Sequence, residues 1–202
     1  MSATDLPFDA RTNEVFPINI WVANFEEMAP HRSALIDDVQ AMLAQGDRPD
    51  LRCSTEPTLQ DHTGPHWSTC FAMATTFTDA LARSIRPQWH HRSIHSWGTV
   101  WSDPAEPREL VDPQVVYQSA TYSCLLWLQI PTELEDQGIF ALRDPLFAVQ
   151  ERIGSPGYAV VVPKELRMFT FPGFLERFSK PASRDLRWSR PLVWLNIDVC
   201  YY

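Results

Sequence analysis

The second half of the chain consists of short apolar runs of strand length, bounded by proline or glycine. Such runs cover residues 93–101, 122–130, 139–142, 158–162, 166–171 and 191–200. Turn signals separate them, such as Pro131, Gly138 and the Pro-Gly pairs at 156–157 and 172–173. Many short strands at this spacing are typical of a sandwich or barrel. The pattern therefore predicts a mostly β fold of the jelly-roll kind, with flanking helices, in the α+β class.

The first half supplies the helices. Apolar residues recur at steps of three and four from Leu35 to Leu43, and Gly46 ends this pattern. A second helix is predicted at about Thr75–Ile85, and Pro87 ends it. Residues 47–66, which lie between the two helices, are rich in turn residues and are expected to form a loop. We expect the two helices to pack together on one outer face of the barrel.

One domain is predicted to account for most of the chain. Polar residues 1–15 are expected to form an extended N-terminal arm, and residues 16–202 a single jelly-roll domain. Its helices should lie mainly in residues 30–87 and its barrel strands mainly in residues 93–202. Residues 16–25 alternate between apolar and other side chains and should add one more strand. A chain of 202 residues is long enough to bury a sizeable core.

Composition excludes several classes of function. Seven scattered glycines, against 17 prolines, cannot supply a Gly-rich phosphate loop. A formal net charge of -8 argues against direct nucleic-acid binding, because phosphate contacts require clustered Lys and Arg. No apolar run reaches the length of about 18 residues that a membrane span needs, and the N-terminus does not resemble a signal peptide. We therefore expect a protein that is cytoplasmic when synthesised, whose four cysteines are reduced.

Three stretches of the chain resemble the 2-oxoglutarate/Fe(II) dioxygenase family, specifically its small prolyl-hydroxylase-like bacterial and phage members. These stretches are FPINIWVANF (16–25), PQVVYQSATYSCLLWLQIP with QGIFALRDP (113–131 and 137–145), and LRMFTFPGFLERFSKP with SRPLVWLNIDV (166–181 and 189–199). Together they cover about two thirds of the chain. The resemblance implies a double-stranded β-helix, which is a form of jelly-roll, and a barrel that in the family holds Fe(II) and 2-oxoglutarate.

The metal-binding triad of that family has no counterpart at the matching positions. The family uses two His and one carboxylate to hold Fe(II) and leaves further positions open. The two ligands of the first family motif fall on Val115 and Tyr117, and the distal His falls on Arg177. No HxD, HxE or HxH motif occurs in the sequence. We therefore predict no metal and no catalytic residues, which favours a protein that has lost enzymatic activity.

Arg190 matches a family position that does survive. The family uses an Arg there to pair the distal carboxylate of 2-oxoglutarate, and a guanidinium suits such a bidentate contact. The resemblance thus implies a residual carboxylate-binding role for Arg190. We favour the alternative that Arg190 lies at a strand edge and pairs with a nearby acid, because without a metal the co-substrate loses its main anchor.

His91 and His95 leave a metal site open as the weaker alternative. At helical spacing these two side chains could bind zinc, although the segment has the pattern of a loop that enters a strand. They could also serve as displaced ligands in an active dioxygenase, together with an acid such as Asp103 or Asp112. In that case the cofactors would be Fe(II) and 2-oxoglutarate.

Three functional hypotheses follow. The favoured one is a catalytically degenerate, dioxygenase-like jelly-roll that serves as a structural or assembly subunit, as in a phage virion at the neck, connector or tail. Its partners would be other protein subunits in an oligomeric assembly, with no direct nucleic acid and no membrane. The second hypothesis is an active 2-oxoglutarate/Fe(II)-dependent hydroxylase with displaced ligands. The third is a cupin-like module that binds a small ligand around Arg190.

Overall fold

The computed structural model describes residues 19–45, 54–89, 92–102, 120–135, 140–143, 158–179 and 187–202. The predicted N-terminal arm lies outside the described residues. So do five of the candidate site residues, namely His91, Asp103, Asp112, Val115 and Tyr117. The described strands, helices and core are sufficient to define the architecture.

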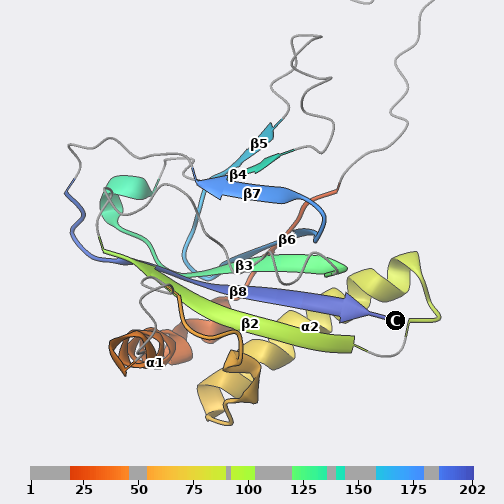
Figure 1. The fold of residues 1–202 in the computed structure, drawn as a ribbon, viewed down its shortest axis with the longest axis horizontal. Helices are drawn as coiled ribbons and strands as arrows, with labels where there is room; N and C mark the ends of the chain where they lie inside the picture. The colour runs from red at the N-terminus through yellow and green to blue at the C-terminus, as the bar shows by residue number, and fades with distance from the viewer. Residues whose placement is uncertain are drawn as a thin grey trace, which may run out of the picture.

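Two antiparallel sheets face each other, as Figure 1 shows. The large sheet has the order β1-β6-β3-β8-β2, formed by Trp21–Asn24, Arg167–Pro172, Tyr122–Gln129, Leu192–Tyr201 and Arg92–Trp101. The small sheet has the order β5-β4-β7, formed by Tyr158–Val161, Phe140–Arg143 and Glu176–Ser179. In the large sheet, no two neighbouring strands are consecutive along the chain. This arrangement confirms the predicted α+β jelly-roll.

The helices lie on the outer face of the large sheet, away from the small one (Figure 1). A 3-10 helix, η2 (Glu26–His31), leads into α1 (Arg32–Gln45), and η4 (Leu59–Asp61) precedes α2 (Pro65–Ile85). A further 3-10 turn, η6 (Thr132–Leu134), follows β3. Among the described residues, no helix combines the length and the apolar character that crossing a bilayer requires. The prediction of two helices on one face is confirmed.

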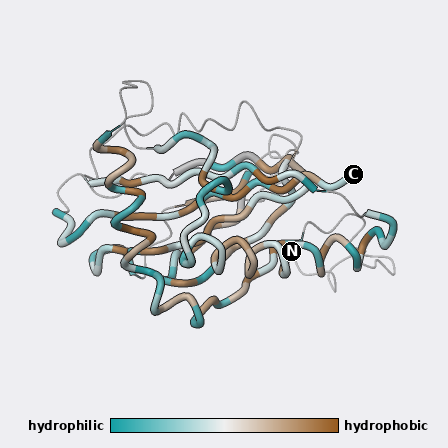
Figure 2. Tube along the Cα trace, turned by 90° about the horizontal axis from the view of Figure 1, so that it is seen from below, coloured by the Kyte–Doolittle hydropathy of each residue, from teal (hydrophilic) through white to brown (hydrophobic). Residues whose placement is uncertain are grey.

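Strand β8 divides the apolar core into two layers because its side chains alternate between the faces of the large sheet. Val193, Leu195, Ile197 and Val199 pack with the helices, as do Leu35 and Val39 of α1 and Trp67 of α2. Leu192 and Trp194 point the other way, into the space between the two sheets. Figure 2 shows the apolar residues gathered along the strands and the inner sides of the helices.

The predicted start of the second helix is wrong by ten residues. Helix α2 begins at Pro65, not at about Thr75, so the end of the expected loop is helical. Proline is favoured at the first position of a helix, where its missing N–H is not needed. Trp67, Cys70, Ala74 and Thr78 are all buried, at steps of three and four residues. The sequence did not reveal this start, because Gly64, Pro65 and His66 at the beginning of the helix have the composition of a turn.

Candidate functional site in the barrel interior

Polar side chains line one end of the barrel interior. On β8, Trp194, Asn196 and Asp198 alternate with the residues that face the helices, so they share the inner face. Asn196 is paired in register with Trp97 on β2. Asp198 is paired with His95 on β2 and with Ser123 on β3. A row of polar side chains, contributed by three strands, therefore crosses the large sheet; we call it the polar row.

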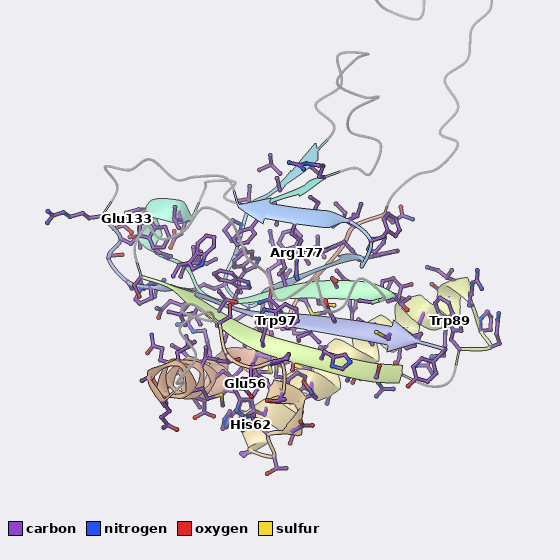
Figure 3. The ribbon with its side chains drawn as sticks, viewed as in Figure 1. Glu56, His62, Trp89, Trp97, Glu133 and Arg177 are labelled. Carbon is purple, nitrogen blue, oxygen red and sulfur yellow. The ribbon has the colours of Figure 1, made fainter. Side chains whose placement is uncertain are left out.

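Arg177 reaches this row from the opposite sheet. Strand β7 positions it so that its guanidinium enters the interior above Trp97, as Figure 3 shows. Its Nη1 donates a hydrogen bond of 3.2 Å to Oδ1 of Asn196. Its Cζ lies 5.7 Å from the ring centroid of Trp97 and 5.8 Å from that of Phe171. With only 6% of its surface exposed, Arg177 is a charged group at the centre of the fold.

Asn196 is held in one orientation by three neighbours. Its Oδ1 also accepts a hydrogen bond from Nε1 of Trp194, at 3.2 Å, and its Nδ2 donates to Oγ1 of Thr99, at 3.1 Å. Each polar atom of the amide thus has a defined partner. This fixed amide holds one nitrogen, Nη1, of the Arg177 guanidinium.

Asp198 forms the other part of the polar row. Ser123 donates a hydrogen bond of 2.6 Å from Oγ to its Oδ1, and both residues are fully buried. Cys124 lies behind this pair on the helix side of β3. Burial raises the pKa of the Cys124 thiol to about 12, and the nearby Asp198 charge acts in the same direction. Cys124 is therefore a packing residue and not a nucleophile.

Aromatic rings pack the opposite end of the interior. The ring centroids of Trp101 and Trp194 are 5.0 Å apart, and Phe140 lies 4.8 Å from Trp127 and 5.3 Å from Trp194. Trp127, Trp194 and Phe140 are almost completely buried. Nε1 of Trp127 has no hydrogen-bond partner within the described part of the chain. The described side chains at this end form a buried aromatic cluster.

Arg190 lies at the junction of the helices and the large sheet. Its Nη2 pairs with Oε1 of Glu165 at 2.8 Å, and its Nε donates to the carbonyl of Ile130 at 2.9 Å. The other oxygen of Glu165 contacts Arg32, the first residue of α1. The backbone N–H of Ile130 also donates to Glu165. Arg190 thus pairs with an acid 25 residues away, which joins α1 to the ends of two strands.

The described residues do not match an Fe(II) triad. His95 and Asp198 are the described imidazole and carboxylate of the polar row. Across the described ranges, no three His, Cys, Asp or Glu side chains are grouped so that they could hold a metal ion. Arg177 offers no lone pair and carries a fixed positive charge. The contacts that the described interior shows are hydrogen bonds to Asn196 and Asp198.

Of the residues that the sequence analysis singled out, Arg177 and His95 lie on strands of the two sheets and Arg190 lies just before β8, but their partners were not identified. Asn196, Asp198 and Thr99 were not singled out as site residues. Their signal is present in the sequence, because Asn and Asp interrupt an otherwise apolar strand at a spacing of two. Polar residues on the inner face of a buried strand require partners, and the partners lie on other strands.

Several solved structures share this architecture. A prolyl-4-hydroxylase from Pseudomonas putida is 12% identical, with a TM-score of 0.59 over 91% of this chain and 92% of that chain. HygX from Streptomyces hygroscopicus, solved with nickel and 2-oxoglutarate bound, is 14% identical, with a TM-score of 0.54 over 90% and 83%. AviO1 from Streptomyces viridochromogenes is 10% identical, with a TM-score of 0.52 over 90% of both chains.

These similarities define the fold of the chain. The described part of the chain has the jelly-roll fold that these solved structures share. No family model matches the sequence, and no curated protein does. At such identities the scaffold is retained while most side chains differ, so function has to be argued from this chain's own residues.

Proposed function

We propose that this chain is a catalytically inactive protein of the dioxygenase fold, and that it acts as a structural or assembly subunit. The observation that carries the proposal is the buried Arg177, hydrogen-bonded to Asn196 inside the barrel. By the sequence resemblance, Arg177 stands where the family has its distal metal-binding His. An arginine there replaces a ligand by a cation.

The chemistry of the guanidinium supports this reading. Arg stays protonated at any pH that proteins tolerate, so it cannot become a metal ligand. A divalent ion placed beside it would meet an uncompensated repulsion in a buried, poorly screened setting. Coordination through the partner Asn196 would first require the loss of its contacts to Arg177, Trp194 and Thr99.

The surroundings of Arg190 support the same reading for the co-substrate. Its guanidinium pairs with Glu165 and the Ile130 carbonyl, and a dicarboxylate would have to displace both. The aromatic cluster of Trp101, Trp127, Trp194 and Phe140 packs one end of the interior. These contacts also disfavour a cupin-like module built around Arg190. The placement of the protein in a phage virion stays a prediction from the sequence resemblance.

Iron binding and co-substrate turnover test the proposal together. The purified protein is incubated with Fe(II) without oxygen, desalted and analysed for iron. It is then assayed for conversion of 2-oxoglutarate to succinate, beside an active prolyl-4-hydroxylase as positive control. We expect iron far below one per chain and no succinate above the protein-free blank. Stoichiometric iron with succinate formation would overturn the proposal.

A second candidate is an active hydroxylase with displaced ligands. It is favoured by one observation, which is that His95 and Asp198 are register partners on the inner face of the large sheet. An imidazole and a carboxylate are two of the three ligand types of a facial triad. If iron is retained in the assay above, this candidate requires that His95→Ala removes it. If the His95→Ala variant still binds iron, His95 is not a ligand and this set of ligands is excluded.

A further inference from the structure

The charges around helix α2 are sorted by sign. Between Ser54 and Ser102, every acidic residue lies at or before Asp79, and every Lys or Arg lies at or after Arg83. Glu56 and Asp61 precede the helix and are exposed, and Arg83 and Arg86 end it and are exposed as well. One end of this segment is therefore acidic and the other basic, in a chain whose net charge is -8.

The acidic end is enlarged by α1. Asp38 of α1 accepts a hydrogen bond from Nε2 of His66, at 2.7 Å, which fixes α1 beside the start of α2. The neighbouring Asp37 is exposed. We define the acidic end as the exposed residues Asp37, Glu56 and Asp61. Arg32, the basic residue of α1, contacts Glu165 instead.

The basic end combines charge with exposed apolar surface. We define it as Arg83, Ile85, Arg86, Trp89 and Tyr202. Ile85 is 54% exposed and Tyr202 67% exposed. The guanidinium of Arg86 lies 5.3 Å from the ring centroid of Trp89, and that ring stacks on Tyr201 at 6.0 Å. Arg, Trp and Tyr are the residue types most enriched at the centres of protein interfaces.

This surface is also rigid. The hydroxyl of Tyr201 donates to Asp79 at 2.6 Å, and Asp79 pairs with Arg92 at 2.9 Å. Tyr201 therefore holds the stacked Trp89 against α2. A preorganised surface loses little conformational entropy when it binds, which favours association. Charge pairing with the helix dipole would explain Arg83 and Arg86 at the end of α2, but not the exposed Ile85 or the stacked rings.

The two ends point in different directions. Helix α2 has 21 residues, and at a rise of about 1.5 Å per residue it separates them by about 30 Å. In Figure 1, α1 lies at the left of the longest axis, whereas the end of α2 lies beside the C-terminus at the right. Figure 3 likewise shows Glu56 and His62 well separated from Trp89. One copy cannot bring its own two ends together.

We propose that the basic end of one copy binds the acidic end of a second copy, so that the chains associate head to tail. The inference names the partner in the assembly role proposed above, and it rests on that role. The surfaces differ, so the contact joins unlike ends: two copies can close as an antiparallel pair through two such contacts, or more copies can join into a ring or an open filament. Charge pairing at exposed residues makes the association weaken as salt screens it.

Charge reversal tests the proposal. Sedimentation of the full chain is measured over a concentration series at two salt concentrations. At about 0.05 M salt surface charges are weakly screened, and at about 0.5 M they are strongly screened. The wild type should form oligomers at low salt and fewer at high salt. Arg83→Glu/Arg86→Glu and Asp37→Lys/Asp61→Lys should each be monomeric. Mixed together, they should assemble again, because each altered end then meets its opposite.

A variant with two charges reversed elsewhere on the surface serves as the control. Lys164→Glu/Arg187→Glu reverses two exposed charges elsewhere and should associate like the wild type. A wild type that stays monomeric at every concentration overturns the inference, as does association that ignores Arg83→Glu/Arg86→Glu. None of these outcomes changes the iron and succinate result, so failure of the two proposals can be told apart.

Discussion

Arg177 on the small sheet is joined to Asn196 on the large sheet by a hydrogen bond of 3.2 Å through the middle of the barrel. The two residues are 6% and 3% exposed. This contact links the two sheets by a charged, directional interaction inside the barrel. The same bond supports both the proposed loss of metal chemistry and a measurable part of the stability.

Arg177→Ala should lower the free energy of unfolding by about 2–4 kcal/mol, because a buried side chain is truncated and Asn196 loses a charged donor. Urea denaturation, followed by circular dichroism, measures this. Arg187→Ala, which changes an exposed Arg, should stay within about 0.5 kcal/mol of the wild type. Equal stability of the two variants would mean that the Arg177 network adds nothing.

Gly98→Ala should be destabilising because α1 packs directly on this residue of β2. A Cβ at position 98 would lie 2.6 Å from Cγ1 of Val39. Such overpacking costs about 1–3 kcal/mol. In the double variant Gly98→Ala/Val39→Ala the clash is removed, so its loss should be smaller than the sum of the two single losses. Additive losses in a denaturation cycle would contradict this packing.

Tyr201→Phe should change how stability responds to alkaline pH. Burial raises the pKa of the Tyr201 phenol above 10.0, and its hydrogen bond to Asp79 raises it further. A raised folded-state pKa gives stability that is complete below the unfolded value and is lost as the pH rises through the folded value. Unfolding free energy measured from about pH 9 upward should therefore fall less steeply in Tyr201→Phe. Identical slopes in both proteins would refute the assignment.

Asp38→Asn should reduce the loss of stability in acid. Burial tends to raise the pKa of Asp38, but hydrogen bonds from His66 and Trp67 outweigh it, so the pKa lies below 3.8. A lowered carboxyl pKa gives stability that is present above the unfolded value and is lost as the pH falls through the folded one. Denaturation curves between about pH 5 and pH 2 test this. Asp37→Asn is the matched control, because it removes the neighbouring carboxylate without touching His66 or Trp67.

The sequence predicted those parts of the fold whose pattern is local. Along strands β2, β3 and β8, apolar residues alternate with polar ones or form a continuous run over eight to ten residues. Each of these strands was predicted within one or two residues of its ends. Strand β7 was not predicted, since four residues directly after a Pro-Gly turn are too short to show a period. Helix α2 was predicted only in its second half, because its first turn carries turn-forming residues.

The site could be predicted only as far as the resemblance reached. It indicated Arg177 and Arg190, but neither Asn196 nor Glu165 as their partners. These pairs are 19 and 25 residues apart and come together through the order of strands, which no local pattern contains. The charge sorting along α2 is visible in the sequence, yet its meaning depends on which residues the fold leaves exposed.

The aromatic cluster gives this protein an optical reporter. Indole rings at the distances found for Trp101, Trp127 and Trp194, which are 5.0 and 5.7 Å between centroids, are close enough for their electronic transitions to couple. The near-ultraviolet circular dichroism of the chain therefore records whether these rings are locked against each other. Because the backbone of strands and helices dominates the far ultraviolet, one instrument can follow the packing of these rings and the formation of secondary structure as separate signals.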